Sequence, residues 1–212
     1  MNLQDTRNEF LKAKLHQDEM PDDPLHAFDI WIKSAIEKGI NEPTAMTLSS
    51  IDLDGKPSSR IVLLKEYSEK GLAFFSNYNS KKGLDIKNNP NICLLFFWPE
   101  LEQQIRIEGK ATKTGKKNSD RYFNSRPTNS QLSAWASPQS QEVQDRQYLE
   151  QLFEKTKNKF KDNKIYRPDF WGGYIVSPTY FEFWQGRQNR LHDRVRYKQT
   201  IGKTWKMNRL AP

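Results

Sequence analysis

The spacing of hydrophobic residues changes along the chain and predicts where helices and strands lie. Apolar residues recur every three or four positions from Leu25 to Ile36, and Gly39 follows them, which predicts a helix over residues 25–38. Apolar or alternating segments separated by turn residues come next. They predict five strands, at residues 45–53, 58–65, 71–76, 91–98 and 104–113.

Helical signals interrupt this group of strands and then follow it. Ser80 is a predicted N-cap for a helix that ends near Asn88. Residues 117–160 are predicted to be largely helical and to cover the sheet. Strand patterns return at residues 171–177, 179–185, 194–198 and 204–210. Strands, then helices, then strands again predict an α+β fold built on an antiparallel sheet or barrel.

The chain of 212 residues is expected to form one domain behind a short arm. Residues 1–24 are polar and charged, and we expect an N-terminal arm with a short helix over residues 6–15. Residues 25–212 form the single predicted domain. The longest apolar run, residues 92–98, is too short to cross a bilayer, so the sequence predicts a cytoplasmic protein.

Composition favours an anionic partner. The chain has 34 Lys and Arg against 26 Asp and Glu, a formal net charge of +8. Phosphorylated small molecules, nucleic acid and acidic membranes are all consistent with that charge. Cys93 is the single cysteine and the histidines are dispersed, so neither an internal disulfide nor a zinc site is expected. The chain also lacks the glycine fingerprint of a dinucleotide-binding fold.

The most concentrated candidate chemistry lies near the C-terminus. Arg190, His192 and Arg194 alternate in sequence shortly after Trp184, so in an extended chain the three side chains share one face. Two guanidinium groups side by side are typical of phosphate or carboxylate binding. A solvated basic strand is the alternative. His192 is expected to be neutral, because positive neighbours disfavour its protonation.

Two further basic groups lie on other predicted elements. Arg60 and Lys65 are five residues apart on a predicted strand, which sends them to opposite faces and predicts two different anions. Lys81 and Lys82 sit at a predicted helix N-terminus, the wrong end for the helix dipole, so they either bind an anion or are simply solvated. Tyr122, Arg126 and Ser130 add a phenol, a guanidinium and a hydroxyl near a helix end.

Several short motifs, taken in order, resemble the pyridoxine (pyridoxamine) 5'-phosphate oxidase family over nearly the whole chain. They are R-I-V-L-L-K at residues 60–65, F-S-N at 75–77, S-R-P at 125–127, W-G-G at 171–173, F-W-Q-G at 183–186, R-L-H-D-R at 190–194 and N-R-L-A-P at 208–212. The resemblance implies an FMN-binding split β-barrel and a homodimer with FMN in clefts between the subunits. It also implies an oxidase that converts pyridoxine or pyridoxamine 5'-phosphate to pyridoxal 5'-phosphate and reduces dioxygen to hydrogen peroxide. Nucleic-acid and membrane partners are not expected.

The same resemblance implies a set of site residues. Arg190 and His192 are the implied catalytic residues, next to the pyridine ring of the substrate. Lys65, Tyr122, Arg126 and Ser130 are implied for the substrate phosphate, with Arg7 and Phe10 of the arm covering the substrate. Lys81 replaces an arginine of the family and Phe10 replaces a tyrosine. The implied FMN ligands are Arg60, Ile61, Val62, Leu63, Leu64, Lys65, Phe75, Ser76, Lys81, Lys82, Gln104, Gln139, Ser140, Trp184 and Arg194.

Three other functions stay open at the level of sequence. Another flavin oxidoreductase on the same barrel would keep the FMN ligands with a different substrate. A carrier of flavin or vitamin B6 would bind without turnover. An RNA-binding module would suit the basic charge, but the aromatic residues lie in apolar patterns rather than alternating with Lys and Arg on an exposed sheet.

Overall fold

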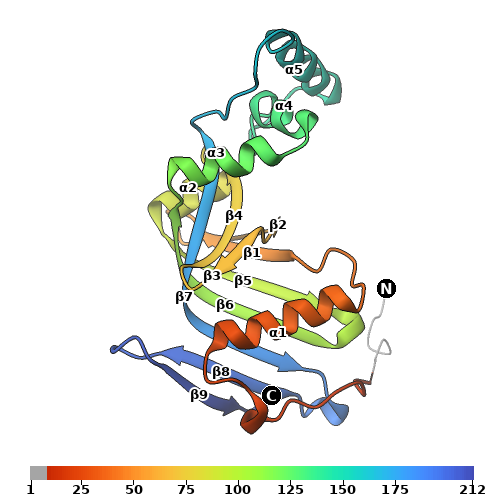
Figure 1. The fold of residues 1–212 in the computed structure, drawn as a ribbon, viewed down its shortest axis with the longest axis vertical. Helices are drawn as coiled ribbons and strands as arrows, with labels where there is room; N and C mark the ends of the chain where they lie inside the picture. The colour runs from red at the N-terminus through yellow and green to blue at the C-terminus, as the bar shows by residue number, and fades with distance from the viewer. Residues whose placement is uncertain (1–8) are drawn as a thin grey trace.

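The computed structural model describes residues 9–212, in which an antiparallel sheet of nine strands is the main element (Figure 1). The helices are α1 (Pro24–Glu37), α2 (Lys81–Asn88), α3 (Lys116–Ser125), α4 (Thr128–Ala136) and α5 (Arg146–Lys159), with short 3-10 turns η1 (Gln17–Glu19), η2 (Pro99–Leu101) and η3 (Gln188–Arg190). The strands are β1 (Ala45–Ile51), β2 (Pro57–Leu63), β3 (Glu66–Ser68), β4 (Gly71–Asn77), β5 (Asn91–Trp98), β6 (Gln103–Lys113), β7 (Trp171–Gln185), β8 (Asp193–Gln199) and β9 (Trp205–Leu210). The predicted α+β architecture is confirmed.

The sheet is organised around β7. The strand order is β2-β1-β5-β6-β7-β4-β3, with β8 also paired to β7 and β9 paired to β8. β6 runs along nearly all of β7, whereas β4 pairs only with its first half and β8 only with its second half. β7 therefore joins two smaller sheets that diverge from each other.

β7 corrects the prediction of two strands at residues 171–177 and 179–185. It is one continuous strand, because a bulge in β7 at Thr179, opposite Glu108 and Gly109 of β6, accommodates Pro178 at the point where β7 changes partners. Gly109 allows this close approach, since a Cβ there would lie 2.3 Å from the Ser177 carbonyl oxygen. The short strand β3 was not predicted.

α1 lies across one face of the sheet and forms the main core with it (Figure 1). The prediction of this helix is confirmed to within one residue, and Gly39, at φ +69°, follows its end. Phe28 is fully buried, with its ring 5.2 Å from Tyr67 and 5.4 Å from Phe96. The opposite side of the sheet, called the outer face below, carries one row of paired residues: Thr47, Leu95, Arg106 and Glu182.

The helical block corrects a second prediction, that it covers the sheet. α3 packs on β7, but α4 and α5 pack on each other beyond the end of the sheet (Figure 1). The apolar residues of α5 are therefore only partly covered, and none of its residues is buried. Among the helices that the structure describes, none combines the length and apolar character that crossing a membrane requires.

The helix predicted over residues 6–15 of the N-terminal arm is not formed in its described part, residues 9–15. Its backbone bonds to distant side chains instead of to its own turns. The Lys12 N–H donates to Glu102 Oε2 at 3.0 Å and the Leu15 N–H to Asp193 Oδ2 at 3.1 Å. Arg209 Nη2 donates to the Leu15 carbonyl at 3.0 Å. The arm therefore lies along β8, β9 and η2.

Replacing Phe28 with Ala is expected to lower the free energy of unfolding by about 3–5 kcal/mol, because it leaves a cavity in the core. Urea unfolding at a fixed protein concentration, followed by circular dichroism, measures this value. Ile36→Ala is the matched control, since Ile36 lies on the same helix but is 53% exposed. That control should cost less than about 1 kcal/mol. Equal losses from the two substitutions would contradict the position of α1 in the core.

Candidate active site

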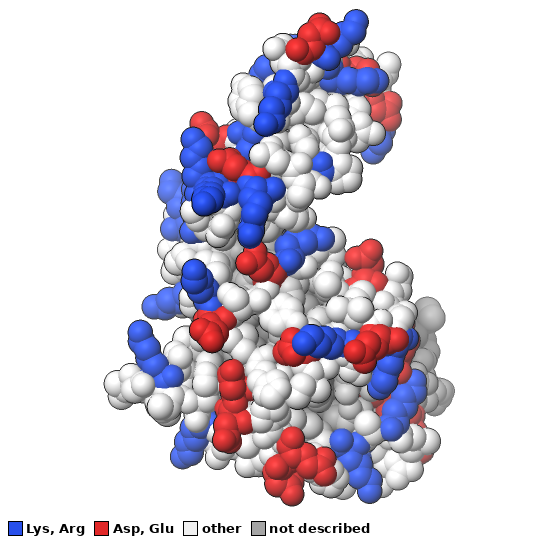
Figure 2. Space-filling model, viewed as in Figure 1, with Lys and Arg blue, Asp and Glu red and all other residues white. Residues whose placement is uncertain are grey.

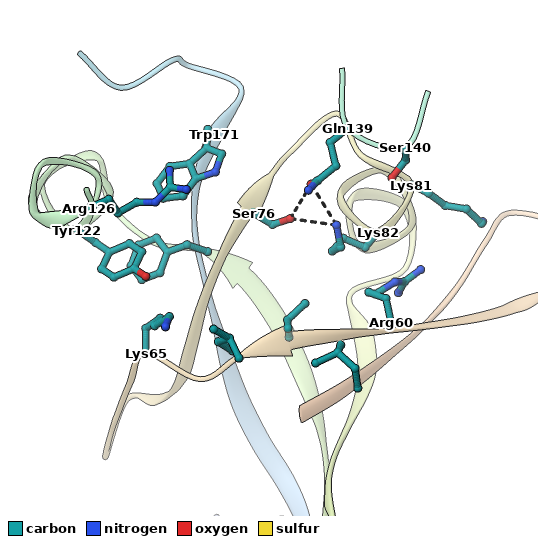
Figure 3. Close-up of a pocket in the computed structure, with 14 residues that line it drawn as sticks. Arg60, Lys65, Ser76, Lys81, Lys82, Tyr122, Arg126, Gln139, Ser140 and Trp171 are labelled. Atoms are coloured by element: carbon teal, nitrogen blue, oxygen red, sulfur yellow. Dashed lines mark hydrogen bonds between the residues drawn. The ribbon is translucent and has the colours of Figure 1, made fainter. Parts of the chain in front are cut away.

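One cavity of about 510 Å³ gathers most of the predicted site residues. It lies between β2, β4, α2, α3 and the loop after α4 (Figure 3). Lys and Arg gather around α2 and α3 on the surface (Figure 2), so the cavity lies in a basic part of the molecule. All its lining residues except Trp171 were predicted from the sequence: Arg60, Ile61, Val62, Leu63, Lys65, Phe75, Ser76, Lys81, Lys82, Tyr122, Arg126, Gln139, Ser140 and Trp171.

Lys82 provides a buried positive charge on one wall of the cavity. Its ammonium donates to Ser76 Oγ, Ser80 Oγ and Gln139 Oε1, each at 3.2 Å, and all three acceptors are uncharged (Figure 3). Burial lowers the pKa of Lys82 to about 8, and the positive charge of Arg60 adds to this shift. An anionic ligand would supply the negative charge that these neighbours lack.

Arg60 lies beside Lys82 and is held mainly by hydroxyl groups. Its Nη1 donates to Ser50 Oγ and its Nη2 to Ser58 Oγ, both at 2.7 Å, while Asp85 Oδ2 lies 3.8 Å from Nη2. Burial lowers the pKa of Arg60. Arg60 and Lys82 therefore form one cationic cluster, called the first cluster below.

Lys81 lines the cavity, but its ammonium points away from it (Figure 3). It pairs with Asp85 Oδ1 at 3.2 Å and Asp52 Oδ2 at 3.3 Å. The hydrogen bonds that its ammonium donates to Asp85 and Asp52 raise the pKa of Lys81. Ser80 caps α2 as predicted, by accepting from the Gly83 N–H. Of the two lysines at this helix start, only Lys82 presents its charge to the cavity.

Arg126 and Lys65 form a second cationic cluster on the opposite wall (Figure 3). The Arg126 guanidinium lies 4.6 Å from the centre of the Trp171 ring, and its Nη1 is buried without a hydrogen-bond partner. Tyr122 stacks on Phe75 with ring centres 3.9 Å apart. Burial lowers the pKa of Arg126 and raises that of Tyr122. Arg60 and Lys65, from which two separate anion sites were expected, therefore lie on opposite walls of one cavity.

The remaining predicted residues lie outside this cavity. Leu64 is buried in the core at 4% exposure. Ser130, in the first turn of α4, is partly buried and does not line the cavity. Arg7 lies outside the described residues. A separate group forms at the other end of β7: Phe10, Gln104, Trp184, Arg190, His192 and Arg194.

His192 is the centre of this separate group. Its ring lies 4.7 Å from Trp184 and 5.4 Å from Phe10, and Gly186 leaves room for Phe10, since a Cβ there would lie 2.7 Å from that ring. His192 Nδ1 accepts from the Arg187 N–H at 3.1 Å, which leaves Nε2 to carry the proton of a neutral ring. The pKa of His192 is lowered, as predicted. Burial is the larger cause and the charge of Arg190 the smaller one.

Arg194 does not contribute to the shift of His192, which corrects the expectation that two flanking arginines act on the ring. The guanidinium is engaged elsewhere: Nε donates to Glu182 Oε1 at 2.9 Å and Nη1 to the Ala211 carbonyl at 2.7 Å. Gln104, Trp184 and Arg194 are directly paired across β6, β7 and β8 on the outer face.

Within one chain, the residues that line the cavity lie far from the group around His192. Ser76, in the cavity, pairs with Gly172, whereas Gln104 pairs with Trp184. At ~3.3 Å per residue, Gly172 and Trp184 are separated by about 40 Å of extended strand. Within one chain the two groups therefore do not meet; they are called the two half-sites below.

Trp171 is the one residue lining this cavity that the sequence analysis did not assign to the site. The W-G-G motif that contains it was noticed, but its ring was not assigned to the site. Trp171 is identified by its contact with the Arg126 guanidinium. No local sequence pattern predicts that contact, because the two residues are far apart in sequence.

Two family models match the chain. Residues 32–160 match the model described as pyridoxamine 5'-phosphate oxidase. Residues 171–212 match the model described as the pyridoxine 5'-phosphate oxidase C-terminal dimerisation region. The second match covers β7, β8 and β9, the strands that carry the His192 half-site.

Curated relatives match over their full length. A pyridoxine/pyridoxamine 5'-phosphate oxidase of Crocosphaera subtropica is 48% identical, with all of both chains covered. One from Cyanothece sp. is 46% identical and covers 100% of this chain and 99% of its own. One from Leptospira interrogans is 43% identical, with 99% of this chain and 98% of its own covered.

Solved structures share the fold. PhzG from Burkholderia lata 383, in complex with tetrahydrophenazine-1-carboxylic acid, superposes with a TM-score of 0.89 at 28% identity, covering 97% of this chain and 100% of that chain. A pyridoxamine 5'-phosphate oxidase-related, FMN binding protein from Nostoc punctiforme has a TM-score of 0.70 at 14% identity, covering 91% and 100%, and supports the fold alone. The predicted split β-barrel fold is confirmed. With both family models matched and full-length relatives at 43–48% identity, the chain belongs to the pyridoxine/pyridoxamine 5'-phosphate oxidase family.

Proposed function

We propose that this chain is an FMN-dependent oxidase that converts pyridoxine or pyridoxamine 5'-phosphate to pyridoxal 5'-phosphate, with dioxygen reduced to hydrogen peroxide. The observation that carries the proposal is one cavity with a cationic cluster on each of two opposite walls. A cofactor and a substrate that each carry a phosphate need two such clusters. The full-length similarity to oxidases of this name supports the same reaction.

The first cluster suits the phosphate of FMN. Lys82 is buried among uncharged acceptors, so a phosphate would compensate its charge, and Arg60 and Ser76 add donors beside it. Gln139 and Ser140 close this end of the cavity. FMN, when bound, supplies the acceptor for a hydride from C4' of the substrate.

The second cluster suits the phosphate of the substrate. Arg126 offers a buried Nη1 without a partner, and Lys65 and Tyr122 lie on the same wall. Holding the phosphate at one end fixes where the rest of the substrate lies, and such positioning is a large part of catalysis. Ser130 is the least supported of these ligands, because it does not line the cavity.

Arg190 and His192 are the proposed residues at the reacting end of the substrate. A neutral His192 presents an Nε2–H donor, and the exposed Arg190 presents a guanidinium beside it. Phe10 packs on His192 and Trp184, and so excludes water from the ring. The roles of Trp184, Gln104 and Arg194 toward FMN follow from the family resemblance.

We also propose a homodimer in which each half-site is completed by the other subunit. The outer face exposes apolar side chains in this chain, with Ile61 64% and Phe97 54% exposed. Ile61 also lines the cavity, and Phe97 pairs with Gln104 of the other half-site. A second copy on this face would cover both. The match of residues 171–212 to a dimerisation region supports the arrangement.

A second candidate follows from the structural relative at 28% identity. That protein was solved with tetrahydrophenazine-1-carboxylic acid, so an oxidase for a ring-fused carboxylic acid is the alternative. The full-length relatives named for the phosphorylated vitamers, at 43–48% identity, favour the first candidate over this one at 28%.

The reaction itself is tested by anaerobic mixing of the FMN-loaded protein with each vitamer. Pyridoxine 5'-phosphate and pyridoxamine 5'-phosphate should each bleach the flavin absorbance, because each donates a hydride from C4'. Admission of dioxygen should then yield hydrogen peroxide and pyridoxal 5'-phosphate, with ammonia only from the amine. Flavin that stays oxidised with both vitamers, yet is bleached by tetrahydrophenazine-1-carboxylic acid, would support the alternative.

FMN affinity is expected to fall as pH rises from about 7 to about 9. Lys82 has a pKa of about 8 in the free protein, so above that pH its side chain is mostly the neutral amine and must take up a proton before it can pair with phosphate. The dissociation constant should rise roughly ten-fold, the limit for one proton per pH unit. Fluorescence titration of apoprotein with FMN measures it. Lys82→Gln should bind weakly with a flat profile, and Lys87→Gln, an exposed lysine on α2, should keep the wild-type slope. A wild-type slope in Lys82→Gln would contradict the assignment.

Shared half-sites predict complementation between inactive variants. Arg126→Gln and Arg190→Met should each have low turnover, and Arg190→Met should keep its FMN. Co-expression of the two should restore about one quarter of the wild-type activity, because about half of the dimers are mixed and each mixed dimer has one intact site. Arg126→Gln with Lys65→Gln is the control, since both changes affect the same half-site. Activity at the level of the single variants in both mixtures would refute the shared site.

A further inference from the structure

Arg126 is held differently from three other partly buried arginines of this chain. Its guanidinium stacks on Trp171 at 4.6 Å and lies 5.9 Å from Phe123. Arg106, Arg167 and Arg194, by contrast, are held by carboxylates: Glu182, Asp120 and Glu182 respectively. A carboxylate occupies the N–H edge of a guanidinium and offsets its charge, whereas a ring contacts its flat face and leaves that edge free.

The ring that holds Arg126 is itself firmly fixed. Trp171 is the first residue of β7 and is 7% exposed. Phe123 packs against its indole edge-to-face at 5.4 Å, and Phe75 stacks parallel to it at 5.8 Å. The Trp171 carbonyl also accepts a hydrogen bond from Arg167 Nη1. A side chain restrained on several sides can define the position of the guanidinium above it.

The N–H edge of the Arg126 guanidinium lies in the cavity proposed to hold the substrate phosphate. Nη1 is buried and has no hydrogen-bond partner, which is costly for a charged donor unless something binds there. Both Arg126 and Trp171 line the cavity. Loss of the ring would free the guanidinium to take other rotamers without removing its charge.

We propose that Trp171 is the positioning residue that holds Arg126 for the substrate phosphate, and so sets the preference of the site for phosphorylated over non-phosphorylated vitamers. The inference rests on the proposed function. It assigns Trp171 no contact with the reacting atoms. Trp171 acts through Arg126. Its contribution to binding of the substrate phosphate should therefore be lost when Arg126 is replaced.

The test compares Trp171→Leu and Trp171→Phe in the FMN-loaded protein. Trp171→Leu should raise KM for pyridoxine 5'-phosphate roughly 10-fold, as expected for loss of a desolvated cation–π contact. Turnover and the FMN dissociation constant should change less than about two-fold, because the reacting end is untouched. The rate of flavin reduction by pyridoxine, which has no phosphate, should not change. Trp171→Phe keeps an aromatic face and should show a smaller rise.

Two controls separate positioning from a structural role. Trp135→Leu makes the same change in another indole of the same hydrophobic cluster that has no contact with Arg126, and should keep the wild-type KM. In an Arg126→Gln background, Trp171→Leu should add no further rise in KM, since the two residues act as a unit. Where Trp171→Leu fails to fold, Trp171→Phe is carried through the same cycle.

The inference is overturned if Trp171→Leu keeps the wild-type KM, if it slows pyridoxine and pyridoxine 5'-phosphate equally, or if its effect persists in the Arg126→Gln background. A wild-type protein whose flavin is not reduced by either phosphorylated vitamer would instead refute the proposed function. The two failures are therefore distinguishable.

Discussion

The pairing of β7 is the constraint on which the rest of the structure depends. One continuous strand keeps β6 as its neighbour while its other edge passes from β4 to β8, and the bulge at Thr179, opposite Gly109, lets this happen without a break. The two halves of β7 therefore carry different chemistry. The first half places Trp171 beside Phe75 and Ser76, and the second places Trp184 beside Arg194. Because the strand is extended, a single chain cannot fold the two ends onto one ligand. The homodimer proposed above would bring the first half of one β7 and the second half of the other to the same ligand.

The cations best placed to bind a ligand in the cavity are those that no carboxylate of the described residues neutralises. Lys81 and Arg194 bond to carboxylates and are satisfied within the protein. Lys82 and Arg126 are buried against hydroxyl, amide and aromatic groups, and burial lowers the pKa of both. Buried cations without anionic partners destabilise the free protein, and a bound phosphate would remove that cost. The net charge of +8 is thus less informative than the distinction between paired and unpaired cations.

Local sequence signals predicted the elements well, and long-range contacts explain what they missed. α1 and the cap at Ser80 depend on residues within a few positions, and both were predicted. The predicted arm helix was wrong because the backbone of residues 9–15 bonds to Glu102 and Asp193, which no local pattern reveals. The candidate site residues came from motif resemblance, and the structure gathers most of them in one cavity. Their division into two half-sites is a property of strand register, which motifs do not encode.

The packing of the N-terminal arm affects the pKa of His192. Burial is the main cause of the lowered pKa of His192, and Phe10 provides part of that burial. Phe10 can pack there because Gly186 has no side chain. The arm is held by Asp193, which also accepts from Arg187 and Arg209. The same carboxylate therefore fixes the arm above the ring and the loop that donates to Nδ1. The lowered pKa of His192 is consequently a result of how the arm, the loop and the C-terminal strand pack together, and not of Arg190 alone.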